Sequence, residues 1–251
     1  MSLDSKTVIV VGAAGRLGRA IVSAALESGA NIVAVDQSES ALQVFEGEDR
    51  VLAVVGDITK KDSIQNVIAT AVRRFGKVDG AVNTAYPRNQ HYGRKFFDVT
   101  YEDFCENLSL HLGGYFLFMQ QCAQYAVDEK KIFSLVNMSS IYGKMAPRFD
   151  IYSGTIMTMP VEYAAIKSAL QHLGSYVTAY TKGAKFRVNC VSPGGILAGQ
   201  DPVFLDKYKS HCREKGMLDS EDIVGAVLFL LSDASEYVCG QNIIVDDGFM
   251  S

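Results

Sequence analysis

Residues 7–18 read TVIVVGAAGRLG: a short β-branched run, a turn with three glycines, and the start of a helical pattern. The run Thr7–Val11 predicts a buried strand, and the apolar spacing that begins at Arg16 predicts a helix. Glycine suits this turn because a β-carbon would obstruct the tight bend and keep the backbone away from a pyrophosphate at the positive end of the helix. The stretch therefore predicts a dinucleotide site; a purely structural glycine turn is the alternative.

The alternation of short and long apolar patterns continues to the end of the chain. Six further β-branched runs predict strands, at Asn31–Val35, Val51–Val55, Val78–Val82, Ile132–Asn137, Phe186–Val191 and Asn242–Val245. The helical stretches are Arg16–Ser28, Ser38–Phe45, Lys61–Phe75, Tyr101–Tyr125, Val161–Tyr180 and Glu221–Leu231. This order predicts an α/β fold, a parallel, doubly wound seven-stranded sheet with helices on both faces. The second, third and sixth strands are almost continuously apolar, which predicts burial on both faces.

Length, charge and cysteine content exclude several classes of protein. The chain has 251 residues, which suits one domain over residues 1–251. Its 24 basic and 28 acidic residues give a formal charge of −4, which disfavours binding to nucleic acid or to an anionic membrane. Five widely spaced cysteines predict neither a disulfide framework nor a metal site, and they favour a reducing cytoplasm. The apolar run Val8–Val11 is too short for a signal segment or a membrane span.

Asp36 indicates which dinucleotide the glycine turn binds. It ends the second strand 18 residues after Gly18, near the offset at which an acid meets the adenosine ribose. Its carboxylate accepts from both ribose hydroxyls and repels a 2′-phosphate, so NAD(H) is favoured over NADP(H). Arg16 is able to pair with such a phosphate, although a solvated position at the helix start is the favoured interpretation. Asp57 has two interpretations of equal weight, an acceptor for the adenine amino group or an N-cap for the helix near Lys60.

A second group of residues predicts acid–base chemistry. Tyr163 and Lys167 place a phenol and an ammonium one helical turn apart, and Ser140 follows the fifth strand at the edge where such sheets bind ligands. The ammonium is expected to lower the pKa of the Tyr163 phenol towards neutrality and make it a proton donor or acceptor. Ser140 is expected to hold a carbonyl or alcohol oxygen against Tyr163. Each residue alone has a structural interpretation, whereas the combination favours an oxidoreductase.

Motifs along nearly the whole chain resemble the short-chain dehydrogenases/reductases. The motifs are Gly12-x-x-Gly15-x-x-Gly18, Asp57, Asn83-Thr84-Ala85, Asn137-Met138-Ser139-Ser140-x-x-Gly143, Tyr163-x-x-x-Lys167, Arg187-Val188-Asn189-x-Val191-x-Pro193-Gly194, Gly240-Gln241 and Val245-Asp246-Asp247-Gly248. The resemblance implies a Rossmann fold and hydride transfer between a nicotinamide cofactor and an alcohol or carbonyl. It also implies that Tyr163 is the acid/base, that Ser140 anchors the substrate, and that Lys167 binds the nicotinamide ribose.

The resemblance further implies how the cofactor is held and how the chain assembles. Such proteins are usually homotetramers or homodimers, often joined through two long helices, here Tyr101–Tyr125 and Val161–Tyr180. Asp36, Asp57, Tyr163 and Lys167 are joined by further residues that are expected to contact the cofactor. These are Gly12, Gly15, Arg16, Leu17, Gly18, Ile58, Asn83, Ala85, Pro193, Gly194 and Ile196.

Three positions and one spacing depart from the family pattern. His111 replaces an asparagine that organises a proton-relay water, so it is a catalytic candidate, with a packed neutral histidine as the alternative. Tyr86 replaces the glycine of an Asn-Ala-Gly turn, and Ala198 replaces a threonine that holds the carboxamide. Ser140 and Tyr163 lie 23 residues apart, which is long for the family and indicates an insertion beside the site.

The insertion and the loop after the fourth strand point to a substrate class. Within the inserted segment 144–160, residues Phe149–Pro160 look like the insertion of bacterial flagellin-modification oxidoreductases of nonulosonic, sialic-acid-like sugar pathways, and so does Tyr86-Pro87-Arg88 in the loop Tyr86–Arg94. Both segments are expected to line the substrate pocket. The substrate-binding candidates are the aromatic Tyr86 and Tyr152, and Arg88, Arg94 and Arg148 as clamps for a carboxylate or phosphate; a loop with solvated charges is the alternative.

These features predict an NAD(H)-dependent oxidoreductase that acts on an alcohol or ketone of a polar, sugar-derived small molecule of the nonulosonic-acid type. One alternative is a sugar-nucleotide epimerase or dehydratase with a retained NAD, although such relatives usually carry a longer C-terminal substrate domain. A non-catalytic dinucleotide-binding scaffold is the other. Such scaffolds commonly lack the tyrosine or the lysine, and both Tyr163 and Lys167 are present here.

Overall fold

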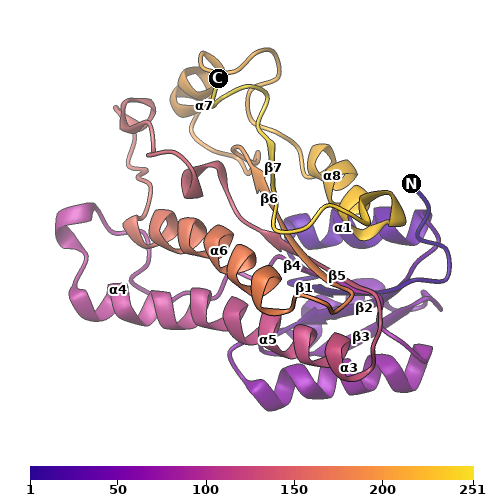
Figure 1. Cartoon of the computed structure of the whole chain (residues 1–251). Helices are drawn as coiled ribbons and strands as arrows, with labels where there is room; N and C mark the ends of the chain where they lie inside the picture. The colour runs from indigo at the N-terminus through magenta and orange to yellow at the C-terminus, as the bar shows by residue number, and fades with distance from the viewer.

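Seven parallel strands form one sheet in the order β3-β2-β1-β4-β5-β6-β7 (Figure 1). The computed structural model describes residues 1–251. The chain moves outward from β1 to β3 and then returns to β4 beside β1, so the strand order reverses between β1 and β4, where doubly wound sheets bind their ligands. The predicted α/β architecture is confirmed. The strands are β1 (Thr7–Val11), β2 (Asn31–Asp36), β3 (Val51–Val55), β4 (Gly80–Asn83), β5 (Phe133–Met138), β6 (Phe186–Pro193) and β7 (Asn242–Val245).

Helices cover both faces of the sheet because side chains alternate along each buried strand. In β1, Val8 and Val10 belong to one hydrophobic core, whereas Ile9 and Val11 belong to the other. The first core lies under α1 (Arg16–Glu27) and α8 (Glu221–Leu231), and the second lies under α3 (Lys61–Phe75), α5 (Gly113–Asp128) and α6 (Val161–Tyr180) (Figure 1). The short α2 (Glu39–Leu42) adds Leu42 to the first core.

The predicted helix Tyr101–Tyr125 is not one continuous α-helix. It consists of α4 (Tyr101–Asn107), a π-helical segment η3 (Leu108–Leu112) and α5. A π-helical turn adds a residue to the helix and changes the direction of the side chains within it, a device common at functional sites. The segment includes His111. The short 3₁₀ turns of the fold are η1 (Gln43–Phe45), η2 (Phe96–Asp98), η4 (Ile141–Gly143), η5 (Phe149–Tyr152) and η6 (Asp233–Ser235).

The expectation that the third strand is buried on both faces is wrong. β3 lies at the edge of the sheet, and Val55 in it is half exposed. An apolar run does not reveal whether a strand has a neighbour on its outer side, because that depends on strand order.

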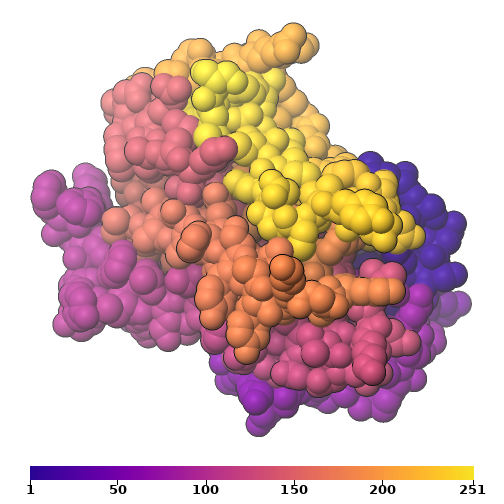
Figure 2. All heavy atoms as spheres, in the orientation of Figure 1, coloured from indigo at the N-terminus to yellow at the C-terminus, as the bar shows by residue number.

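Helix α7 (Pro202–Lys209) was not among the predicted helices. Asp201 caps it by accepting a hydrogen bond from the backbone N–H of Val203, and Pro202 occupies its first turn, where proline is tolerated. With η5 and the C-terminal Phe249, α7 forms a small third hydrophobic cluster beyond the carboxyl edge of the sheet. Figure 2 shows the inserted segment in pink next to the C-terminal residues in yellow.

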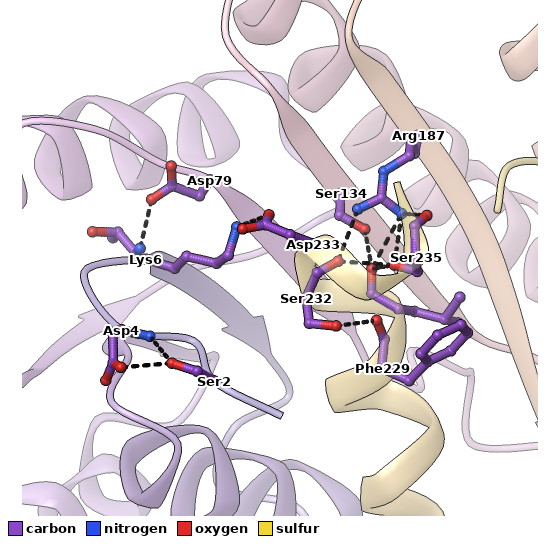
Figure 3. Close-up of polar contacts among 12 residues, drawn as sticks. Ser2, Asp4, Lys6, Asp79, Ser134, Arg187, Phe229, Ser232, Asp233 and Ser235 are labelled. Carbon is purple, nitrogen blue, oxygen red and sulfur yellow. Dashed lines mark hydrogen bonds and ion pairs between the residues drawn. The ribbon is translucent and has the colours of Figure 1, made fainter. Parts of the chain in front are cut away.

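Arg187 joins β6 to the end of α8. Its buried guanidinium donates to the backbone oxygen of Ser235 at 2.7 Å and to the Ser235 hydroxyl at 2.9 Å (Figure 3). Its other nitrogen donates to the carbonyl of Ser232 at 3.4 Å. The guanidinium therefore satisfies backbone oxygens at a helix end that is shielded from water. Among all the helices, none has both the length and the apolar character that crossing a membrane requires.

We expect Arg187→Met to lower the free energy of unfolding by about 2–4 kcal/mol, because the buried oxygens lose their donors. Asp233→Asn is the matched control: it breaks the nearby ion pair with Lys6, at 2.6 Å, on a side chain that is 85% exposed. That change should cost less than about 1 kcal/mol. Urea unfolding of both variants measures the difference, and equal losses would contradict this role of Arg187.

Candidate active site

A cavity of about 610 Å³ opens at the carboxyl edge of the sheet. Its floor includes Ser140, Tyr163 and Lys167, and the glycine turn after β1 borders one end. An adjoining hollow of about 240 Å³ contains Asp36 and Ile58. The two hollows share four lining residues, so they form one elongated cleft; the shared residues are Gly15, Thr84, Ala85 and Tyr86.

The glycine turn leaves the positive end of α1 open towards this cleft. Gly12 adopts a φ of +72°, and a β-carbon on Gly18 would lie 2.1 Å from the carbonyl oxygen of Gly12. Gly15 is the N-cap of α1, no side chain caps this end, and its first turn carries no acidic residue. Unpaired backbone N–H groups and a positive helix end fit a pyrophosphate group.

Asp36 lies in the smaller hollow. Its carboxylate accepts from the backbone N–H of Ala14 at 3.2 Å and of Ser38 at 3.3 Å, which fixes it at the end of β2. Arg16 is not simply solvated: its guanidinium donates to the carbonyl oxygen of Leu197 at 2.6 Å and so spans one end of the larger cavity. The remaining cofactor candidates on the cavity wall are Leu17, Gly18, Pro193, Gly194 and Ile196.

Asp57 is not an N-cap. The helix α3 begins after Lys60, whose side chain does not cap it, and Asp57 instead accepts from the backbone N–H and hydroxyl of Thr59 at 2.9 and 2.6 Å. Asn83 lies outside both hollows, where its side-chain oxygen accepts from the backbone N–H of Ala85 at 3.1 Å. Asn83 therefore shapes the turn that brings Ala85 to the cleft wall.

Ser140, Tyr163 and Lys167 meet as the sequence predicts. Ser140 follows β5 and lies beside Tyr163, and its hydroxyl accepts from the backbone N–H of Tyr142 at 3.2 Å. Lys167 lies one turn further along α6, with its Nζ 5.5 Å from the centre of the Tyr163 ring. Its ammonium donates to the carbonyl oxygen of Met138 at 2.7 Å.

Burial, and not the lysine charge, dominates the acidity of these groups. Burial lowers the pKa of the Lys167 ammonium to about 7. Burial also raises the pKa of Tyr163, although the hydrogen bond from Ser140 partly offsets it. The expectation that Lys167 lowers the pKa of this phenol is wrong, because desolvation penalises both charged forms. Tyr163 is accordingly a protonated phenol at neutral pH.

The π-helical segment η3 brings His111 against Lys167. The ring is fully buried, its Nε2 lies 3.4 Å from the Lys167 Nζ, and its Nδ1 is buried without a partner. Burial, followed by the charges of Lys167 and Arg88, lowers the pKa of His111 to about 2. The ring is therefore neutral and able to accept a hydrogen bond from Lys167 on one nitrogen while the other carries a proton that it can donate.

Tyr86 forms the boundary between the two hollows. Its ring meets those of His111 and Tyr163 edge-on, at centroid distances of 5.0 and 5.8 Å. Its hydroxyl donates to that of Tyr92 at 2.7 Å. The loop that carries Tyr86 is held by Asn89, whose backbone N–H donates to the side chain of Asn107 at 2.9 Å.

The three arginines proposed as clamps do not line the cavity. Arg88 lies over the outer side of the Tyr86 ring, 4.8 Å from its centre, and Arg94 pairs with Asp103 at 2.8 Å. Arg148 lies over the Phe249 ring at 5.5 Å, with its Nε buried and unpaired. Their expected contact with the substrate is therefore not supported by their positions, because each guanidinium packs against the protein outside the cavity.

The inserted segment does line the cavity, and it contributes Tyr152, as expected, with Met157 and Met159. Residues outside the sequence-based set lie opposite, on and beside α7: Phe204, Tyr208 and Met217. The pair Asp201–Pro202 is an N-cap followed by proline, which was the available signal for this helix.

A family model, two relatives and a solved structure each match this chain over nearly its whole length. A family model described as enoyl-(acyl carrier protein) reductase matches residues 12–250. Post-translational flagellin modification protein A of Campylobacter coli is 37% identical over 98% of this chain and 99% of its own length. A 3-oxoacyl-(acyl-carrier-protein) reductase of Thermotoga maritima is 29% identical over the full length of both chains. A short-chain dehydrogenase from Leptospira borgpetersenii with bound NAD⁺ superimposes with a TM-score of 0.88 at 30% identity, over 100% of this chain and 94% of that one.

The depressed pKa of Lys167 predicts a pH-dependent stability. The unfolded protein binds a proton at Lys167 up to about pH 10.5, whereas the folded protein releases it near pH 7. The cost of burying the ammonium is complete below pH 7 and disappears as pH rises towards 10.5. From pH 7 to 9, the free energy of unfolding of the wild type should therefore rise relative to Lys167→Met by at least about 1 kcal/mol. Urea unfolding at several pH values measures this, and a constant or falling difference would refute it.

Proposed function

The chain belongs to the short-chain dehydrogenase/reductase family, and from that premise we propose that it is an NAD(H)-dependent oxidoreductase of an alcohol or ketone on a polar, sugar-derived substrate of the nonulosonic-acid type. The observation that carries the proposal is the convergence of Ser140, Tyr163 and Lys167 on the cavity that adjoins the open end of α1. The flagellin-modification relative supports the sugar-derived substrate.

The side chains of the site have complementary roles in the reduction of a ketone. Bound nicotinamide supplies the hydride to the carbonyl carbon, or accepts it in the reverse direction. The Ser140 hydroxyl donates a hydrogen bond to the carbonyl oxygen, which holds it against Tyr163. The Tyr163 phenol, protonated at neutral pH, gives its proton to that oxygen as the alcohol forms.

Lys167 and His111 return the proton that Tyr163 loses. The pKa of Lys167, about 7, allows it to give up a proton near neutral pH, and the neutral His111 ring beside it is able to accept a hydrogen bond from its Nζ. In the cofactor complex, Lys167 also binds the nicotinamide ribose, as the family resemblance implies. The asparagine position of the relay is then filled by an imidazole with the same ability to accept and donate.

We also propose a homotetramer or homodimer in a reducing cytoplasm. The long helices α5 and α6 expose large apolar side chains that a second copy would cover: Phe116 is 45% exposed, Tyr176 62% and Tyr180 81%. All five cysteines are free thiols, which supports the reducing compartment.

Tyr163→Phe should lower kcat at least about 100-fold and leave NADH affinity within about twofold, because it removes the proton donor but little binding surface. Lys167→Ala should lose both rate and cofactor affinity. Activity is measured on the best substrate from a panel of nonulosonic-type sugars, simple sugars, steroids and acyl ketones, and NADH binding by fluorescence. Substantial turnover by Tyr163→Phe would refute the acid–base role, and preference for the apolar compounds would refute the substrate class.

NADH should bind at least about tenfold more tightly than NADPH, because the Asp36 carboxylate in the smaller hollow repels a 2′-phosphate. Asp36→Ala should narrow this gap. Glu27→Ala, which removes an exposed carboxylate at the far end of α1, is the control for net charge and should leave the gap unchanged. Fluorescence titration with NADH and NADPH measures the two affinities. Tighter binding of NADPH than of NADH by the wild type would refute the predicted preference.

A further inference from the structure

Besides Tyr86 and Tyr115, four tyrosines from four separate elements line the larger cavity. Tyr142 comes from η4, Tyr152 from η5, Tyr163 from α6 and Tyr208 from α7. The hydroxyls of Tyr142 and Tyr152 lie 3.4 Å apart. The sequence separation between the first and the last of these residues is large, so only the packing of the inserted segment on α7 brings them together.

Besides Tyr163, the proposed proton donor, two of these hydroxyls keep a hydrogen for a ligand. Tyr152 donates to the oxygen of Tyr142, and the Tyr142 hydroxyl hydrogen has no acceptor in the protein. The oxygen of Tyr208 accepts from the backbone N–H of Gly195 at 2.6 Å, and its hydrogen likewise has none. Since a phenol both donates and accepts, an oxygen in the cavity would complete the hydrogen bonding of each group.

Tyr208 lies beside the segment that the cofactor would contact. A β-carbon on Gly194 would lie 2.9 Å from the Tyr208 hydroxyl oxygen, so this glycine is needed for the close approach. Burial raises the pKa of all four phenols, and Tyr142 raises those of Tyr163 and Tyr208 further. All four side chains are therefore uncharged at physiological pH and offer hydrogen bonds without a net charge.

Only two charged side chains line the cavity, one at the glycine turn and one beside Tyr163. Among its lining residues the charged side chains are Arg16 and Lys167, and each already donates to a backbone carbonyl oxygen, of Leu197 and Met138 respectively. The rest of the wall near the tyrosines is apolar and adaptable, formed by Met157, Met159, Phe204 and Met217. Such a wall suits the C–H faces of a ring whose edges carry oxygen atoms.

We infer that Tyr142 and Tyr208 are specificity-determining residues that bind two oxygens of an uncharged, polyhydroxylated ring next to the reacting carbon. Any carboxylate or phosphate of the substrate stays outside the cavity. This inference rests on the proposed function, and it narrows the substrate: the part that enters is recognised by its hydroxyl pattern and not by charge.

Ligand-observed NMR and calorimetry with the NAD⁺-loaded protein test the inference. The probes are N-acetylneuraminic acid, its uncharged methyl ester, N-acetylglucosamine and cyclohexanol. The acid and ester should bind within about threefold of each other, and cyclohexanol should bind more weakly because it offers one oxygen. Tyr142→Phe should weaken binding of the sugars about 2–10-fold, the loss of one neutral hydrogen bond, and leave cyclohexanol unchanged.

Tyr208→Phe is the second variant and should also weaken binding of the sugars. Tyr237→Phe, at a side chain that is 92% exposed, is the control and should change nothing. Binding of the acid more than about tenfold tighter than the ester would overturn the inference, as would equal sugar binding by Tyr142→Phe or no binding of any sugar.

The same samples separate this inference from the proposed oxidoreductase function. Sugar binding that depends on Tyr142 without any NADH formation would leave the recognition site standing and refute the chemistry. If both Tyr142→Phe and Tyr208→Phe formed NADH from a sugar at an unchanged kcat/KM, the oxidoreductase function would stand and the recognition role of the two tyrosines would be refuted.

Discussion

The close approach of α1 to the end of β1 is the constraint on which the site depends. With no β-carbon at Gly18, the first turn of α1 packs against the carbonyl oxygen of Gly12, and the open helix end points along the cleft. Because all strands run in the same direction, the residues that follow β2, β4, β5 and β6 reach the same edge. The glycine turn and the parallel sheet therefore place a binding site for anionic groups beside the tyrosine and lysine of α6.

Desolvation governs the chemistry at that edge. Lys167, Tyr163 and His111 all lie where water is scarce, and each is shifted towards its uncharged form. An ammonium with a pKa near 7 and a phenol with a raised pKa both suit proton transfer without a standing ion pair. The π-helical segment η3 contributes by turning His111 towards the lysine, at the one point where α4 and α5 depart from regular geometry.

One wall of the cavity is built from a part of the chain that the sheet does not organise. The inserted segment packs on α7 and on Phe249, and Lys207 donates to the carbonyl oxygen of Ser153 at 2.7 Å. On the opposite wall, Asn107 links the Tyr86 loop to the buried Glu162, the residue before Tyr163, through a hydrogen bond of 3.2 Å. Hydrogen bonds and packing thus hold both walls against neighbouring elements, which limits the width of the cavity.

The sequence by itself determined the parallel sheet, most helix bounds, the glycine turn, and the association of Ser140, Tyr163 and Lys167 with one edge. These follow from local periodicity and from the common direction of the strands. Tertiary structure alone decided the edge position of β3, the partners of Arg88, Arg94 and Arg148, and the place of Tyr208 in the cavity. The physical reason is that a side chain's environment is set by segments far away in the chain: an arginine is free or paired, and a phenol neutral or ionised, according to neighbours that no local pattern of residues contains.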